Sequence, residues 1–474
     1  MSNEQTTEVT KSACSFAVGL AFDDIPVDVR DKMKLHIVDA IGSGVAGAGS
    51  TLGRQLINLT ALEHAPDAVP VLGSSNAFGP AAAAFANAGA MNALDCDDGF
   101  EVAGRGMGHP GASIVAAAVS GAYAAASASG ARFLTAITAS YEINNRIILS
   151  IQPTIERFRL VYGVCQHQSV SSAIAYSLHN GASPDDLRNI MGLAGTLANV
   201  PSLRKYNFED RPIVSLKDFN APAAESGVRA AQMHATGLSG PKAVLDGPSG
   251  LWRMLGSDQF DPDVITEGLG ETWLARRSSL KAYPACRWMH TCLEAFQDTF
   301  EKQGLVIADV VRVRVFTTGG MVSDFMDPTP TNMVDAQFSL PYSIAALAHR
   351  ITPFASWFDE NVMRDSSILA FAKKVHAIVD PEFDNLMRNE RRPAGRVEIE
   401  TRRGTYTSDR VDYAIGSPER PLSPDRVKSK FLSNAAPAIG EAKAAELCGR
   451  LMALENEDDV RSVLSIAFLG GEAS

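Results

Sequence analysis

The longest apolar run of the sequence, residues 111–141, consists largely of alanine, serine and glycine (GASIVAAAVSGAYAAASASGARFLTAITASY). A membrane-spanning helix needs about 20 predominantly apolar residues. Gly121, Gly130 and Arg132 interrupt this run, and it is poor in leucine and phenylalanine. Small side chains instead allow buried helices to pack closely. The run therefore predicts two buried helices of a mainly helical protein and no membrane span.

The composition fits a protein of this kind. Hydrophobic residues make up 46% of the 474 residues and aromatic residues only 7%, which favours closely packed helices over a β-sandwich. The net charge of −11, without a Lys/Arg block, argues against nucleic acid or an anionic membrane as the partner. The N-terminus has no secretory signal pattern and the cysteines form no CxxC pair, so we expect a cytoplasmic protein without disulfides.

Helical periodicity dominates up to about residue 255. After the start signal of Pro26, apolar residues recur every four positions from Val29 to Val45, which predicts an amphipathic helix. Turn clusters separate further alanine-rich segments, which predict helices at 79–93, 111–127, 130–150, 168–180, 184–197 and 220–236.

Strand patterns enter after residue 300. Residues 310–319 alternate apolar and basic side chains, and residues 396–415 predict a β-hairpin that turns at Arg403 and Gly404. Helical stretches lie between these strands, at about 335–350, 356–361 and 365–378.

We therefore predict a mainly α fold in which a large all-α helical domain is interrupted by a smaller α+β lid domain. The first helical part is expected at 1–274, the lid at 275–416, and the helices that complete the helical domain at 417–474. Ser423 is expected to cap the first of these C-terminal helices.

Two motifs suggest ligands but fail on context. GSGVAG at 42–47 matches a dinucleotide fingerprint, yet the residues before it follow helical spacing, so close helix packing is expected there. DCDDG at 95–99 resembles a calcium loop, but its glycine falls one place early and the twelfth position is Gly106 instead of glutamate.

Proton transfer is the interpretation of residues 93–113 (ALDCDDGFEVAGRGMGHPGAS) that remains. Neighbouring carboxylates raise one another's pKa, and a histidine exchanges protons near neutral pH, so the cluster suits acid–base catalysis. Its members are Asp95, Asp97, Asp98 and His109. Two alternatives stay open: an oxygen-rich metal site, and aspartates that only cap helices beside a histidine satisfied within its loop.

A second polar cluster lies in LKAYPACRWMHTC, residues 280–292, at the predicted domain junction. Its polar residues are Lys281, Cys286, Arg287 and His290. Domain junctions favour ligand clefts, and two cations there can hold carboxylates through charge-assisted hydrogen bonds. Alternatively, both cations are solvated and the cysteine is buried. Lys217, in SLKDFNAPAAESG, is a third candidate, although such a lysine usually lies at the surface.

Six segments, taken in order, resemble the MmgE/PrpD family. They are HIVDAIGSGVAG, NALDCDDG with HPGAS, LKDFNAPAAESG, KAYPACRWMH, DAQFSLPYSIAAL and SPERPLSPDRVKSKF. The resemblance spans nearly the whole chain. The family includes 2-methylcitrate dehydratase, cis-aconitate decarboxylase and iminodisuccinate epimerase.

The resemblance implies a helical domain formed by both chain ends, a lid between them, a homodimer and no organic cofactor. It places the active site between helical domain and lid. The catalytic residues that it implies are Asp95, His109, Lys217, Lys281 and Tyr342. Cys286 stands where some members carry histidine, and Arg287 and His290 belong to the same motif, so these three are expected to bind substrate.

One segment departs from the family pattern. Many members carry an active-site histidine in a GFHPT-like segment, whereas this chain reads LVYGVCQHQSVSSAIA at 160–175. The alignment puts Val161 or Tyr162 at that histidine, and His167 follows about one and a half helical turns later. His167 is therefore the candidate substitute, and the departure indicates a divergent substrate.

The family chemistry is bond breaking next to a carboxylate. Loss of a proton there forms an enolate, which the buried cations Lys217 and Lys281 are expected to stabilise. His109 is expected to protonate the leaving hydroxyl, with Tyr342 as a further donor. We predict a lyase, first a dehydratase, that acts on a small anionic di- or tricarboxylate. The alternatives are an epimerase, then a decarboxylase, then a non-catalytic helical scaffold.

Overall fold

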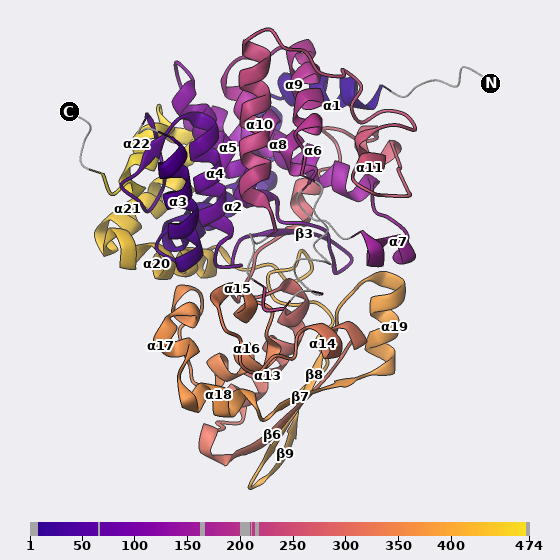
Figure 1. Ribbon diagram of the computed structural model, residues 1–474, viewed down its shortest axis with the longest axis vertical. Coiled ribbons are helices and arrows are strands. Elements are labelled where there is room, and N and C mark those ends of the chain that lie inside the picture. The colour runs from indigo at the N-terminus through magenta and orange to yellow at the C-terminus, as the bar shows by residue number, and fades with distance from the viewer. Residues whose placement is uncertain are drawn as a thin grey trace.

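The computed structural model describes residues 8–64, 67–161, 166–199, 209, 211–213 and 218–470. Helices dominate these residues and strands form only small sheets, which confirms the mainly helical class. Figure 1 shows helices from both chain ends gathered in one part and the larger sheet in another. We call these the helical part (9–266 and 424–464) and the sheet part (290–407). The predicted domain boundaries stay a prediction.

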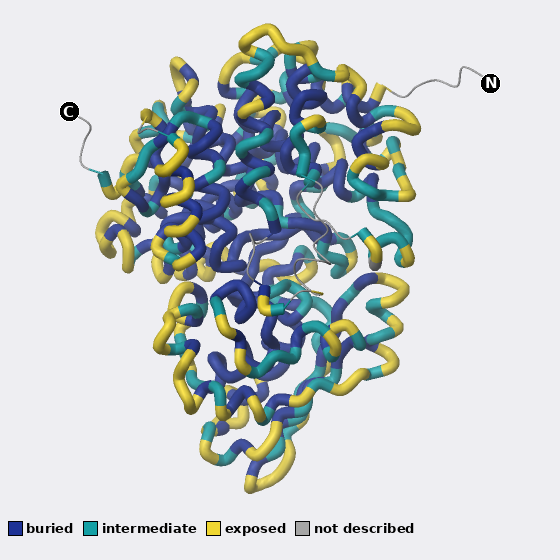
Figure 2. The backbone as a smooth tube through the Cα atoms, viewed as in Figure 1, coloured by how far each residue is buried: buried dark blue, intermediate teal, exposed yellow. Residues whose placement is uncertain are grey.

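Alanine-rich helices form the centre of the helical part. They are α4 (Pro80–Asn92), α5 (Pro110–Ala124), α6 (Gly130–Ser150), α8 (Gln168–His179) and α10 (Asn220–Ala235). α5 packs against the other four and is buried over its first three turns, within the dark blue interior of Figure 2. The run at 111–141 thus forms two buried helices, as predicted. Among the described residues, no helix combines the length and apolar character that a membrane span requires.

Helix α2 (Val27–Ala48) joins the two ends of the chain. It packs against α4 and against α20 (Pro424–Ile439), which begins at the capping Ser423. A Cβ at Gly47 would lie 1.9 Å from the Ala90 carbonyl oxygen of α4, so only glycine fits there. GSGVAG therefore serves close helix packing within α2, as expected.

Smaller helices complete the helical part. They are α1 (Val9–Gly19), α3 (Thr51–Glu63), α7 (Ile155–Leu160), α9 (Pro184–Thr196), α11 (Leu251–Met254), α12 (Asp263–Thr266), α21 (Glu441–Met452) and α22 (Val460–Leu464). A short hairpin of β1 (Val69–Pro70) and β2 (Ala77–Phe78) lies beside α4. The sequence pattern did not predict α1 and α3.

The sheet part is built on a four-stranded sheet in the order β7-β6-β8-β9. Its strands are β6 (Val310–Thr317), β7 (Val375–Val379), β8 (Arg396–Thr401) and β9 (Gly404–Thr407). The hairpin prediction is confirmed, but β9 is shorter than expected, and Thr401 pairs with Gly404 so that the turn falls one residue earlier. The predicted helix at 365–378 is wrong in its second half, because β7 pairs there in parallel with β6.

Seven helices of the described residues accompany this sheet. They are α13 (His290–Lys302), α14 (Gly319–Asp324), α15 (Met333–Ala336), α16 (Leu340–Ala348), α17 (Glu360–Met363), α18 (Ser366–Ala372) and α19 (Pro381–Glu390). α13 packs against β8 and α16 and carries the apolar core of the sheet part. The sequence pattern did not predict α13 and α19.

A third, smaller sheet lies where the two parts meet (Figure 1). Its order is β4-β3-β5, with β3 (Gly99–Val102), β4 (Arg105–Gly106) and β5 (Ser278–Ser279). Gly99 pairs with Ser279 and Phe100 with Ser278. This pairing brings the acidic segment at 93–113 next to the basic segment that begins at Leu280.

Candidate functional site

Lys281 and Asp95 form a buried ion pair at the edge of the small sheet. Lys281 is the second residue after β5, and its Nζ contacts Asp95 Oδ1. Their side chains are 2% and 1% exposed, so water screens their attraction very little. Asp95 has a φ of 50°, a left-handed conformation that aspartate tolerates better than most residues. Unfavourable backbone geometry of this kind is concentrated at functional sites.

A cavity opens beside this ion pair, and we call it the His109 cavity. It contains about 410 Å³ of space between atoms, part of it open to solvent. Four predicted site residues line it: His109, Lys281, Cys286 and Arg287. The other described lining residues are Gly99, Phe100, Glu101, Gly106, Met107, Gly108, Ser279 and Trp288. The structure therefore brings most of the two predicted polar clusters to one place.

His109 precedes α5 and is held in a defined orientation. Its Nδ1 donates a hydrogen bond of 2.7 Å to the carbonyl oxygen of Asp98. Because a carbonyl oxygen only accepts, this bond fixes the proton on Nδ1 in neutral His109 and leaves Nε2 to exchange protons. Nε2 lies 3.8 Å from Asp218 Oδ2. His109 can therefore act as a base and then as an acid.

Asp98 supports His109 from within the helical part. Its carboxylate accepts hydrogen bonds of 2.8 Å each from His36 Nδ1, the Tyr141 hydroxyl and the Gly111 backbone N–H. The last of these caps α5, as one of the sequence alternatives anticipated. Burial raises the pKa of Asp98 to about 6, against the lowering effect of these hydrogen bonds. Asp98 is thus a charged group held in place by donors from α2, α5 and α6.

Arg287 lines the His109 cavity and is held by two neighbouring side chains. Its Nε contacts Glu101 Oε1 at 2.7 Å, and its Nη1 donates to His290 Nδ1 at 3.1 Å. His290 in turn donates from Nε2 to the Ala285 carbonyl oxygen at 3.0 Å. Burial and the nearby Arg287 hold the pKa of His290 well below its usual value, so this ring is neutral. Nη2 of Arg287 is buried and has no hydrogen-bond partner among the described atoms.

Lys430 of α20 ties the C-terminal helices to this site. Its Nζ forms an ion pair of 2.6 Å with Asp39 of α2. The same nitrogen donates to the carbonyl oxygens of Cys96 and Lys281, the latter at 3.0 Å. The backbone on which Asp95 and Lys281 stand is therefore fixed from both ends of the chain.

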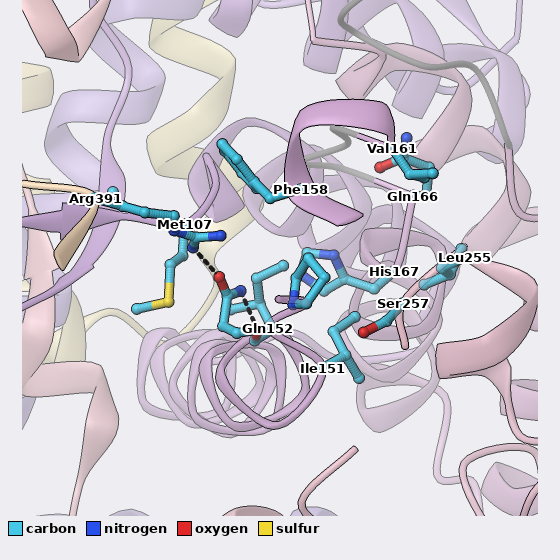
Figure 3. A pocket seen from close by; sticks show the side chains of 13 residues that line it. Met107, Ile151, Gln152, Phe158, Val161, Gln166, His167, Leu255, Ser257 and Arg391 are labelled. Carbon is cyan, nitrogen blue, oxygen red and sulfur yellow. Dashed lines mark hydrogen bonds between the residues drawn. The ribbon is translucent and has the colours of Figure 1, made fainter. Parts of the chain in front are cut away.

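The remaining predicted residues lie elsewhere. Tyr342 is buried in the sheet part, where its hydroxyl donates to the Trp357 carbonyl oxygen, and it is not among the described residues that line the His109 cavity. His167 lines a second, adjoining cavity (Figure 3). Lys217 and Tyr162 lie outside the described residues.

The acidic segment does not converge on a metal. Asp95 contacts Lys281, Asp97 accepts a hydrogen bond of 3.0 Å from Asn92, and Asp98 faces His36 and Tyr141. Over the ranges that the structure describes, no group of three or more His, Cys, Asp or Glu side chains could hold a metal ion.

Sequence reasoning missed several residues of the site. Glu101 lies inside the segment at 93–113 and Asp218 follows Lys217, so both were adjacent to predicted positions. His36 and Lys430 lie within segments that carry the family resemblance, but like Tyr141 they sit in ordinary helical patterns, so none of the three was singled out. Their roles depend on packing between helices that are distant in the sequence.

These features define a class: a mainly helical protein whose polar cavity holds a histidine oriented for proton exchange beside an ion-paired lysine and arginine. The chain belongs to the MmgE/PrpD family. The model of the MmgE/PrpD N-terminal domain matches residues 11–263, and that of the C-terminal domain matches residues 283–452. This confirms the family resemblance seen in the sequence.

Relatives of known name cover almost the whole chain. A cis-aconitate decarboxylase of Aspergillus terreus is 24% identical, with 97% of this chain and 95% of that protein aligned. The cis-aconitate decarboxylase-like protein oryM of Aspergillus oryzae is 22% identical, with 98% of each chain aligned. The cis-aconitate decarboxylase of Mus musculus is 23% identical, over 95% of this chain and 91% of that protein.

Proposed function

We propose that this chain is a cofactor-independent lyase that removes carbon dioxide from a small di- or tricarboxylate in the His109 cavity. The observation that carries the proposal is that Arg287, whose buried Nη2 is a donor without a partner among the described atoms, lines the same cavity as His109 and Lys281. A carboxylate is the natural acceptor for a guanidinium. The names of the relatives support the choice of decarboxylation.

The proposed reaction needs one cation and one proton donor. As the bond to the departing carboxylate breaks, its electron pair passes into an enolate of the remaining carboxylate. Lys281 stabilises the negative charge of that enolate, and carbon dioxide leaves. The proton on Nε2 of His109 then moves to the carbon that lost carbon dioxide. His109 is the one histidine among the described residues that line the cavity, and the decarboxylation needs a single proton donor.

Dehydration, the reaction predicted first from the sequence, is the second candidate. The geometry of His109 favours it, because Nε2 near Asp218 can protonate a leaving hydroxyl. A dehydration also needs a base that removes the proton next to the carboxylate. His109 would then have to act as both base and acid, or a second residue would have to take one of these roles. We place it second for that reason.

Other family properties remain proposals for this chain. We propose the homodimer, the helical domain with an inserted lid, and the catalytic roles of Lys217 and Tyr342 on the strength of the resemblance. Cys286 lines the His109 cavity and is proposed to contact substrate. His290 does not line it and is proposed to orient Arg287.

Product analysis with a panel of polycarboxylates tests the proposal. Release of carbon dioxide supports decarboxylation, whereas gain of alkene absorbance without carbon dioxide supports dehydration. Deuterium incorporation at a stereocentre without either product indicates an epimerase. His109→Gln should lose about 10²–10⁴-fold in turnover, the usual contribution of a general acid. His234→Gln, at a half-buried position in the last turn of α10, is the matched control and should keep full turnover. Full turnover of the His109 variant refutes the assignment.

A further inference from the structure

A second cavity adjoins the His109 cavity, and we call it the Arg391 cavity (Figure 3). Gly106 and Met107 line both cavities, so the two meet along this segment at the end of β4. The end of α6, the helix α7 and the start of α8 form its walls in the helical part. Arg391, directly after α19, reaches it from the sheet part. The cavity thus lies between the two parts, beside the proposed reaction site.

Arg391 gives the Arg391 cavity a positive charge. Arg391 is buried, with 6% of its surface exposed. Its guanidinium carbon lies 4.1 Å from the centre of the Phe158 ring. It also donates to the side-chain oxygen of Gln152 (Figure 3). No aspartate or glutamate is among the described residues that line the cavity. In a protein with a net charge of −11, a buried cation in a cavity whose described lining holds no carboxylate favours an anionic ligand.

His167 adds an unsatisfied polar atom to the same cavity. The residue is 2% exposed, and its Nε2 has no hydrogen-bond partner among the described atoms. Burial lowers the pKa of His167 to about 3, so the ring is neutral at physiological pH and presents a nitrogen that can donate or accept. Buried polar atoms are nearly always hydrogen-bonded in folded proteins, which makes an unpartnered one a candidate ligand contact.

The other walls of the Arg391 cavity combine apolar and polar side chains. Met107, Ile151, Phe158 and Leu255 line it together with Gln152, Gln166 and Ser257. A ligand that fits has a carboxylate at its end and an aliphatic segment behind it, because the guanidinium pairs with the carboxylate and the apolar walls exclude water from the segment.

We propose that the Arg391 cavity binds the distal carboxylate of the substrate, while the reacting carboxylate lies in the His109 cavity. The part of this proposal that concerns the reacting carboxylate rests on the proposed function, whereas the binding of a carboxylate in the Arg391 cavity does not depend on it. Arg391 holds the distal carboxylate, and His167 Nε2 contributes the second hydrogen bond. The substrate is then a dicarboxylate or tricarboxylate whose two ends are separated by an aliphatic segment that passes Met107. His167 is a binding residue in this arrangement and not a substitute for the missing family histidine.

Saturated acids that cannot react test the binding directly. Glutarate and adipate are compared with butyrate and hexanoate by titration calorimetry on the full chain. In the wild type, the second carboxylate should tighten binding by about tenfold, as expected for one charge-assisted contact. Arg391→Met should abolish that advantage. Arg388→Met removes the same charge from the exposed side of α19 and should preserve it.

Further variants keep the test decisive if Arg391→Met does not fold. Arg391→Lys retains the charge without the fork of the guanidinium and should keep part of the advantage. His167→Phe keeps the ring and removes the nitrogen, and it should weaken dicarboxylate binding about threefold. The proposal is overturned if both Arg391 variants still bind dicarboxylates more tightly than monocarboxylates by the wild-type factor. It is also overturned if Arg388→Met loses this preference as fully as Arg391→Met does.

Turnover separates this proposal from the proposed function. Binding that depends on Arg391, in a protein that converts no polycarboxylate of the panel, supports the cavity and refutes the lyase. Turnover that is equal in wild type and Arg391→Met, with an equal KM, supports the lyase and refutes the cavity.

Discussion

Removal of Lys281 should lower stability because Asp95 loses its contact with the lysine. It should lower turnover because the enolate loses a stabilising cation. In Lys281→Met, Asp95 loses this buried cation while its side chain stays 1% exposed. Breaking a buried ion pair from one side costs about 3–5 kcal/mol, because the remaining charge has no water to solvate it. The free energy of unfolding is only about 5–15 kcal/mol for a typical protein, so the urea midpoint should fall clearly. Turnover of the folded protein should fall about 10²–10³-fold, the usual loss when one stabilising group of an enolate is removed.

The double variant Asp95→Asn with Lys281→Met distinguishes the two effects. It removes both charges of this pair, so it should recover about 2 kcal/mol of the lost stability or more. Its turnover should stay as low as that of the single variant. Arg146→Met is the control for a buried pair elsewhere, since Arg146 contacts Glu142 at 2.6 Å and lines neither cavity. It should lose stability but keep its turnover per folded molecule. Recovery of turnover in the double variant, or equal stability of single and double variants, refutes the reasoning.

Two further predictions concern the support of His109. The pKa of Asp98 is raised by burial to about 6, so the folded protein binds this proton more tightly than the unfolded chain. The wild type should therefore lose about 1 kcal/mol of stability relative to Asp98→Asn between pH 5 and pH 8, measured by urea unfolding at both values. In Gly111→Ala, the new Cβ would lie 2.6 Å from the Tyr141 hydroxyl oxygen and 2.7 Å from Asp98 Oδ1. This variant should lose about 1–3 kcal/mol and also lose turnover, in unfolding and activity assays, because the Asp98 loop that orients His109 must shift.

Local signals in the sequence predicted the alanine-rich helices well. The helix expected at 130–150 is α6, which spans the same residues because Ser129 caps its start and the apolar spacing continues to its end. β7 was missed because its sequence is compatible with a strand and with a short helix. The pairing with β6 is what makes this segment a strand. Short strands such as β5 carry too little pattern to be predicted at all.

The candidate site shows the same division. Asp95, His109 and Lys281 were predicted from residue type and family resemblance, but their convergence depends on the pairing of β3 with β5. The sequence left two possible roles for Asp98, that of a catalytic group and that of a helix cap. In the structure its carboxylate caps α5 through Gly111, and its backbone oxygen holds His109.

The charges around the His109 cavity are balanced in pairs, and this balance determines how a substrate can be bound. Lys281 faces Asp95 and Arg287 faces Glu101, so these four residues add no net charge to a protein that is already at −11. A polycarboxylate therefore gains little from long-range attraction, and directed donors such as Arg287 Nη2 must hold it. Donors fixed before the substrate arrives interact most strongly where negative charge develops during the reaction. Such an arrangement raises turnover more than ground-state affinity, which is what an enzyme requires and a binding scaffold does not.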